Sequence, residues 1–218
     1  MKQINRTHTP WLWICTVLCV WGCAQVPRES SDSYLSRGHD HHIQGQVDQA
    51  ISDYSKAIKK NPADGEAYYN RGAAYNQKGL YDRAISDYSK VIGMDPTDAE
   101  AYNNRGNAYY RKGQYDEAIS DYNKALDINP RDGDVYNNRG NAYNRKGQYD
   151  YAISDYNKAI ELDPLLPEAY KNRAVAYFYE QEYEKAWQDV WKAQDLGFPV
   201  GDEFLNALRE ASGFSGRP

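Results

Sequence analysis

Asparagine side chains recur along this 218-residue sequence at a spacing that suits binding. A step of 34 residues separates Asn70, Asn104, Asn138 and Asn172, and further asparagines accompany them at Asn103, Asn107, Asn137, Asn141 and Asn144. Each carboxamide has two N–H donors and an acceptor oxygen, which match the backbone groups of an extended peptide whatever its sequence. Asparagine is a poorer helix former than alanine, so a stripe of asparagines on predicted helices needs a reason.

The histidines offer weaker chemistry. His39 and His42, at i and i+3 of a helix, could share a metal ion with Asp40. Two helical histidines without a fixed third ligand make a poor metal site, so surface or core roles are favoured, with His41 at an aromatic core position. We therefore predict no metal and no cofactor.

Catalytic motifs are missing from the sequence. It contains no His-Glu-x-x-His, no Gly-x-Ser-x-Gly, no Walker loop and no dinucleotide glycine fingerprint. The 31 acidic residues leave a hydrolytic carboxylate pair open as an alternative, but a binding protein needs none of these groups. Because those acids outnumber the 26 basic residues, the chain also lacks the basic field of a nucleic-acid binder. We predict a protein that is not an enzyme and binds no nucleic acid.

Residues 1–22 are typical of an export signal. Lys2 and Arg6 precede an uncharged run from Trp11 to Gly22. This run is shorter than the roughly 20 apolar residues that a membrane-spanning helix needs. An uncleaved anchor is the alternative interpretation.

The end of this run, where a small residue precedes Cys23, resembles the lipobox of bacterial lipoproteins. That resemblance implies a lipidated, palmitate-bearing Cys23 followed by a polar linker over residues 23–33. It also implies a place on the periplasmic face of the outer membrane, because Ala24 is not the aspartate of inner-membrane lipoproteins. A generic signal peptide with an incidental cysteine is the alternative.

A 34-residue period organises the remaining chain. It connects Gly38, Gly72, Gly106 and Gly140, then Ala50, Ala84, Ala118, Ala152 and Ala186, and finally Pro62, Pro96, Pro130 and Pro164. Within residues 100–112, Tyr102, Gly106 and Tyr109 share one helical face, and a second apolar stripe follows Gly113. Each unit is therefore predicted to be two antiparallel helices, which must stack on neighbouring units to bury their apolar faces.

The order Tyr-x-x-Arg-Gly-x-x-Tyr, then Ala-x-x-x-Tyr, then Pro, resembles the tetratricopeptide repeat. The resemblance implies an all-α fold, a right-handed superhelix (α-solenoid) of about five helix-turn-helix repeats over residues 34–200. The expected units are 31–64, 65–98, 99–132, 133–166 and 167–200. Residues 201–212 are expected to form an amphipathic capping helix above Trp187 and Trp191, and residues 213–218 a short tail.

Arginine and aspartate also recur with the period. Each arginine is followed sixteen residues later by an aspartate, in the pairs Arg37 and Asp53, Arg71 and Asp87, Arg105 and Asp121, Arg139 and Asp155, and Arg173 and Asp189. The constant offset predicts an ion pair within each hairpin or between neighbours. Two independent solvated charges copied by duplication are an equal alternative, since exposed pairs contribute only about 0–1 kcal/mol.

In tetratricopeptide arrays the first helices line a concave groove, so the resemblance places the asparagine stripe there. The predicted groove residues are Asn70, Asn103, Asn104, Asn107, Arg111, Asn137, Asn138, Asn141, Arg145, Lys171 and Asn172. The expected partner is a protein or an extended peptide. Asparagines copied by duplication, without a ligand, are the alternative.

Together these expectations describe a membrane-anchored scaffold of the bacterial cell envelope. The resemblance suggests two roles: an adaptor that gathers envelope enzymes, or a pilotin-like factor that assembles pili or secretion pores. A metal-binding or hydrolytic protein is less favoured.

Overall fold

The computed structural model describes residues 30–214, and the regular structure within this range is helical. The helices are α1 (Ser31–Ile43), α2 (Val47–Lys60), α3 (Gly65–Gln77), α4 (Tyr81–Met94), α5 (Ala99–Arg111), α6 (Tyr115–Ile128), α7 (Gly133–Arg145), α8 (Tyr149–Leu162), α9 (Pro167–Tyr179), α10 (Tyr183–Asp195) and α11 (Asp202–Ser212). Among the described helices, none has the length and apolar character needed to cross a membrane. The predicted export signal and Cys23 lie outside the described residues.

Local sequence signals set the ends of the helices. The first helices of the second, third and fourth units follow an aspartate that caps them, as Asp98 does by accepting a hydrogen bond from the Ala101 N–H at 2.8 Å. A tight turn then leads into the second helix, and its glycine adopts the left-handed backbone region, for example Gly113 at φ 79°. The second helix ends just before a proline, which disfavours helix in the residue preceding it, as at Pro130 after α6.

Each of the first four hairpins packs a glycine against a tyrosine. In the third unit, Gly106 of α5 lies so close to Tyr122 of α6 that an added Cβ would sit 2.8 Å from the ring atom Cε1. Tyr122 is 1% exposed, so its ring has little room to move. In the fifth unit, Ala174 replaces the glycine and Val190 replaces the tyrosine, and both are fully buried. The larger residue on the first helix is thus matched by a smaller one on the second.

The recurring arginine and aspartate form a bidentate ion pair inside every hairpin. In all five units the arginine Nε and Nη2 donate to the two carboxylate oxygens at 2.6–2.9 Å. From the second unit on, the arginine Nη1 also donates to the second helix of the preceding unit, as Arg105 does to Ser89 at 2.9 Å. The aspartates are buried. The alternative of independent solvated charges is therefore wrong, and each arginine ties two units together.

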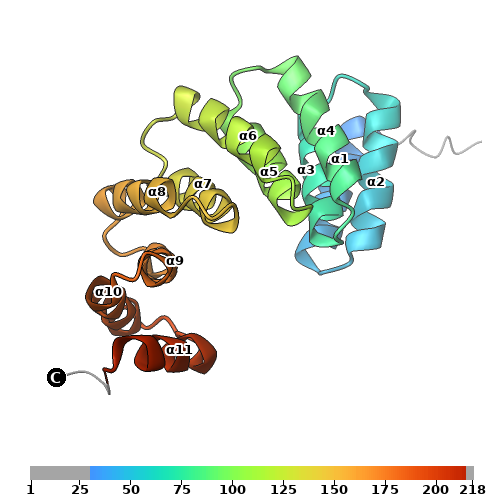
Figure 1. The fold of residues 1–218 in the computed structure, drawn as a ribbon. Helices are drawn as coiled ribbons and strands as arrows, with labels where there is room; N and C mark the ends of the chain where they lie inside the picture. Colours follow the sequence, from blue (N-terminus) through green and yellow to red (C-terminus); the bar gives the residue numbers. More distant parts are fainter. Residues whose placement is uncertain (1–29, 215–218) are drawn as a thin grey trace, which may run out of the picture.

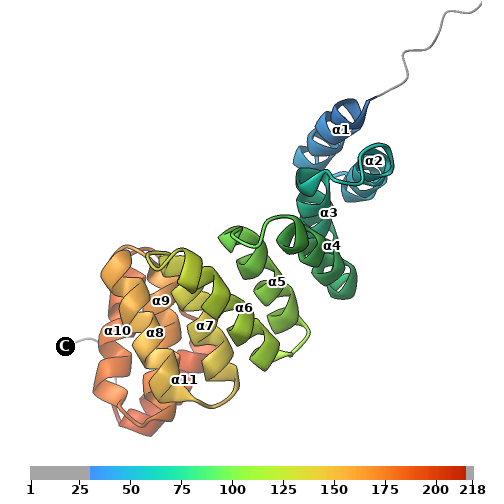
Figure 2. The same cartoon turned by 90° about the horizontal axis from the view of Figure 1, so that it is seen from above.

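The units stack in a curved row, which Figures 1 and 2 show from two directions. Each second helix packs on the next first helix, and successive first helices also touch each other, α1 with α3, α3 with α5, α5 with α7 and α7 with α9. The first helices therefore form the inner face of the row. This arrangement confirms the predicted all-α solenoid of helical hairpins.

The last helix closes the row. Leu205 and Leu208 of α11 are buried in one cluster with Trp187 of α10, and the Trp187 indole donates to the Ser212 hydroxyl at 3.1 Å. Trp191 occupies the place that Asn157 has in the fourth unit. Asn157 accepts a hydrogen bond from Arg173 of the fifth unit. Since no sixth arginine follows, an apolar ring fills this place, and α11 acts as the predicted cap.

Candidate binding groove

Two depressions lie side by side on the inner face. The larger, of about 670 Å³, is lined by residues of α1, α3, α4 and α5, and the smaller, of about 270 Å³, by residues of α3, α5, α6 and α7. Asn76 and Arg111 line both. The two depressions are therefore parts of one groove that crosses the first helices of three units.

The groove contains five of the residues predicted from the sequence. Asn104 and Arg111 line the larger depression, and Asn107, Arg111, Asn138 and Asn141 the smaller one. The other predicted residues lie outside these linings: Asn70, Asn103, Asn137, Arg145, Lys171 and Asn172. The groove is thus concentrated on the second to fourth units.

Several asparagines are linked by hydrogen bonds between neighbouring units. The amide nitrogen donates to a side chain 35 residues earlier, from Asn104 to the Tyr69 hydroxyl (2.7 Å), from Asn138 to Asn103 Oδ1 (3.2 Å) and from Asn172 to Asn137 Oδ1 (3.1 Å). These bonds give the asparagines a structural role that the sequence analysis did not consider. They also fix the amide orientation, while Asn104 and Asn138 each keep one N–H and the carbonyl oxygen free of partners within residues 30–214.

Two other asparagines hold the buried tyrosines of the hairpins. The Tyr122 hydroxyl donates to Asn107 Oδ1 at 2.8 Å, and the Tyr156 hydroxyl donates to Asn141 Oδ1 at the same distance. Burial raises the pKa of both phenols, so both hydroxyls remain protonated donors at neutral pH. Asn107 and Asn141 therefore each accept a hydrogen bond from the core through the amide oxygen, while their amide N–H groups are available to a ligand.

The two predicted arginines differ in their surroundings. Arg145 Nε donates to the Tyr115 hydroxyl at 3.3 Å, and this bond raises the Arg145 pKa. Arg111 makes no ion pair or hydrogen bond among residues 30–214, although its side chain borders both depressions. Arg111 is thus the unpaired cation of the groove.

The side of the groove away from Arg111 is acidic. A third depression, of about 360 Å³, has the acidic lining residues Glu66, Asp95, Asp98 and Glu100, and it shares Tyr69 with the larger depression. The Tyr69 hydroxyl donates to Glu100 at 3.3 Å, and burial together with the Glu100 charge raises the pKa of Tyr69 to about 12. Glu100 and Arg111 begin and end one face of α5, about 16 Å apart along its axis. Opposite charges therefore flank the asparagine-lined floor.

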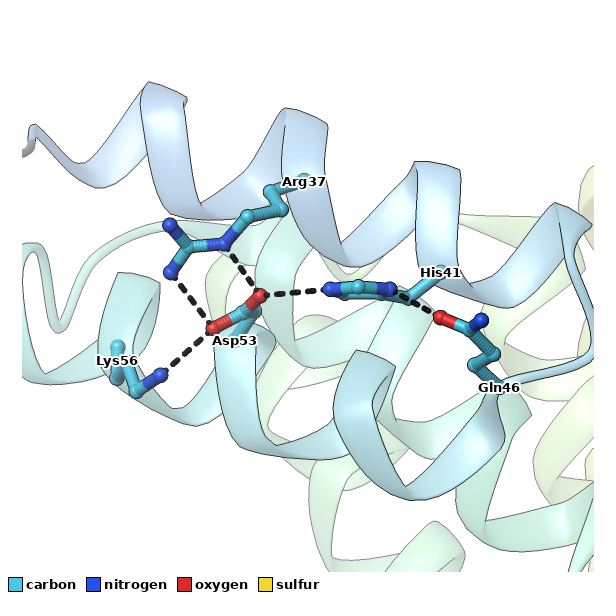
Figure 3. Close-up of polar contacts among 5 residues, drawn as sticks. All are labelled: Arg37, His41, Gln46, Asp53 and Lys56. Atoms are coloured by element: carbon cyan, nitrogen blue, oxygen red, sulfur yellow. Dashed lines mark hydrogen bonds and ion pairs between the residues drawn. The ribbon is translucent and has the colours of Figure 1, made fainter.

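Two histidines of α1, His41 and His42, make polar contacts. Figure 3 shows His41 between Gln46, at 2.7 Å from Nδ1, and Asp53, at 3.6 Å from Nε2. Hydrogen bonds from Arg37 and Lys56 lower the pKa of Asp53 to about 2. His42 Nε2 contacts Gln77 Oε1 at 2.9 Å. In the described part of the chain, no three His, Cys, Asp or Glu side chains are grouped to hold a metal ion.

Sequence reasoning missed several groove residues, among them Tyr69, Asn76 and Tyr88, which line the larger depression. A break in the period could have drawn attention to them. Positions 73, 107 and 141 are 34 residues apart, and the second unit has Ala73 where the third and fourth units have asparagine. Ala73 also lines the larger depression.

Sequence profiles described as TPR repeat match residues 38–79, 74–113 and 106–147, and profiles described as Tetratricopeptide repeat match residues 133–164 and 155–188. Together the matches span more than half of the chain. The chain belongs to the tetratricopeptide repeat family. No curated protein matches the sequence of this tetratricopeptide protein at a significant level.

Solved structures of tetratricopeptide proteins share the fold. A crystal structure of MamA is 30% identical and superposes with a TM-score of 0.69, over 73% of this chain and 94% of that one. YrrB, described as a TPR protein with an unusual peptide-binding site, is 22% identical with a TM-score of 0.67, over 86% and 94%. PilF of Pseudomonas aeruginosa is 21% identical with a TM-score of 0.73, over 84% of each chain.

Proposed function

We propose that this tetratricopeptide protein is a scaffold that holds an extended segment of a partner protein in the groove over α3, α5 and α7. The observation that carries the proposal is the state of Asn104 and Asn138, whose amides are oriented by bonds to the preceding unit yet retain free hydrogen-bonding groups at the depressions. Groups already fixed in place lose little entropy on binding. Asn70, Asn172 and Lys171 would extend the same contact surface at its two ends.

Family membership supports this proposal. Tetratricopeptide proteins are typically interaction scaffolds without catalytic activity, and the structure of YrrB is described by its peptide-binding site. The sequence carries no catalytic motif, which favours binding over catalysis. The partner we propose is a protein or an extended peptide, without nucleic acid, because acidic residues outnumber basic ones.

We further propose that a lipid on Cys23 anchors the scaffold to the bacterial cell envelope, on the periplasmic face of the outer membrane. The support comes from the sequence alone: an uncharged run too short to span a bilayer, followed at once by a cysteine. Stable anchoring needs more than one acyl chain, which lipoprotein modification would supply. The likeness to PilF concerns the fold, so it does not favour the pilotin-like role over an adaptor role.

A photoreactive amino acid placed on each face of the solenoid tests the groove. Gln77 is exposed and lines the larger depression, whereas Ser120 is exposed on α6, a second helix. Irradiation of intact cells should give defined adducts from position 77 and none from position 120. Adducts from position 120 alone would place the binding surface on the outer face and overturn the proposal.

A further inference from the structure

The larger depression is lined by a tyrosine hydroxyl that lacks a hydrogen-bond partner among residues 30–214. In the third and fourth units the core tyrosine donates to an asparagine, Asn107 or Asn141. The second unit has Ala73 in that place, so the Tyr88 hydroxyl has no hydrogen-bond acceptor within residues 30–214. The Tyr88 side chain is 1% exposed, yet it lines the depression of about 670 Å³. The hydroxyl borders the depression and uses no acceptor of the described chain, so it can donate to an acceptor of a ligand.

The same depression contains the unpaired guanidinium of Arg111. No acidic residue lines either of the two depressions that Arg111 borders. The other polar lining groups of the larger depression are neutral amides and hydroxyls together with His42, which contacts Gln77: the amides of Asn76, Gln77 and Asn104 and the hydroxyls of Tyr69 and Tyr81. Glu100 belongs to the adjoining acidic depression, where it accepts from Tyr69. The charge of Arg111 is therefore not neutralised within the groove.

A carboxylate matches these two donors. It has only acceptor oxygens, it can accept two parallel bonds from a guanidinium, and its remaining lone pairs can accept from a phenol. Neutral amides also surround the space, so a carboxylate entering it would meet no like charge in the lining.

We propose that the depression at Ala73 is a subsite for a carboxylate of the bound segment, held by Arg111 and the Tyr88 hydroxyl. This inference rests on the proposed function, because it names the chemistry that the groove selects. The carboxylate belongs either to an aspartate or glutamate side chain or to the C-terminus of the segment. Both sources present the same group to the site, and peptides in which each is removed separately distinguish them.

The probes are peptides that the purified full chain selects from a random display library. Each selected peptide is synthesised with its acidic side chains intact or replaced by the matching amides, and with its C-terminus free or amidated. Fluorescence polarisation then gives affinities. Removing the recognised carboxylate should weaken binding to the wild-type chain about tenfold, as expected for the loss of a hydrogen bond to a charged group.

Three variants assign that difference to the subsite. Arg111→Gln and Tyr88→Phe should bind all peptide forms with nearly equal affinity. Ala73→Asn should do the same, because the new amide would accept from Tyr88 and fill the space, as Asn107 does in the third unit. This variant should fold, since asparagine occupies the place in two other units. Arg131→Gln, at an exposed loop arginine, is the charge-matched control and should keep the tenfold difference.

The failures of the two proposals are distinguishable. The subsite is overturned if the selected peptides show no carboxylate dependence, or if they show the same dependence with the wild-type and Arg111→Gln chains. Either result leaves the proposed binding of a segment in the groove standing. If the library yields no peptide that binds in the groove, both the subsite and the proposed function are overturned.

Discussion

Replacing Gly106 with alanine should destabilise the solenoid, although alanine is the better helix former. In a helix interior, glycine to alanine is worth about 1 kcal/mol in favour of alanine. At Gly106, however, the new Cβ would lie 2.8 Å from Tyr122 Cε1 and 3.0 Å from Cδ1, so the ring must move. Tyr122 is 1% exposed and its hydroxyl is bonded to Asn107. Overpacking of this kind costs about 1–3 kcal/mol, and with so little freedom we expect the upper part of that range and a net loss of about 1–2 kcal/mol.

A matched glycine provides the control. Gly93 lies in α4 with no atom within 4 Å of an added Cβ, so Gly93→Ala should stabilise the chain by about 1 kcal/mol. Chemical denaturation followed by circular dichroism compares the two variants. Adding Tyr122→Val to Gly106→Ala copies the fifth unit and should give a double variant more stable than the sum of the single effects. Stabilisation by Gly106→Ala equal to that by Gly93→Ala would refute the reasoning.

Three further predictions concern the ion pairs and the anchor. Asp121→Ala leaves the largely buried Arg105 guanidinium unpaired and should lower the unfolding free energy by about 3–5 kcal/mol in chemical denaturation. Asp127→Ala, at an exposed pair, should lower it by less than about 1 kcal/mol, and equal losses would contradict a buried pair. The lowered pKa of Asp53 means that its stabilisation is complete above its ordinary pKa of 3.8 and is lost as pH falls through about 2. The unfolding free energy of Asp53→Asn should therefore fall less steeply over that pH interval, and parallel curves would contradict this assignment. Cys23→Ser should abolish incorporation of labelled palmitate, and a wild-type chain that takes up no label would disprove the lipid anchor.

The repeat architecture could be predicted from the sequence because its determinants are local and copied. Gly106, Ala118 and Tyr122 occupy equivalent places in several units, so each unit supplied the same evidence for two crossing helices. The helix caps and turns are short-range as well, as at Asp98 and Gly113. Agreement between local signals at every unit is what makes such a fold recognisable.

The polar contacts could not be predicted in the same way, because they depend on how the units stack. A sixteen-residue offset between Arg105 and Asp121 is compatible with a bond inside a hairpin or with none, and the extra bond from Arg105 to Ser89 exists only in the stacked array. Likewise, the bond from Asn138 to Asn103 joins two units and is not implied by either one. The period also drew attention to what is repeated, whereas the subsite at Ala73 arises where the repetition fails.

Binding by the asparagine floor is the central claim, and one titration tests it most directly. The partner segment identified by crosslinking at position 77 is titrated calorimetrically against the wild-type chain and against Asn104→Ala/Asn138→Ala. Each lost amide leaves backbone groups of the segment unpaired, so we expect a loss of about 1–3 kcal/mol per site. Asn206→Ala, at an exposed asparagine of α11, is the control and should bind like wild type. A double variant that folds and binds with unchanged affinity would contradict the account.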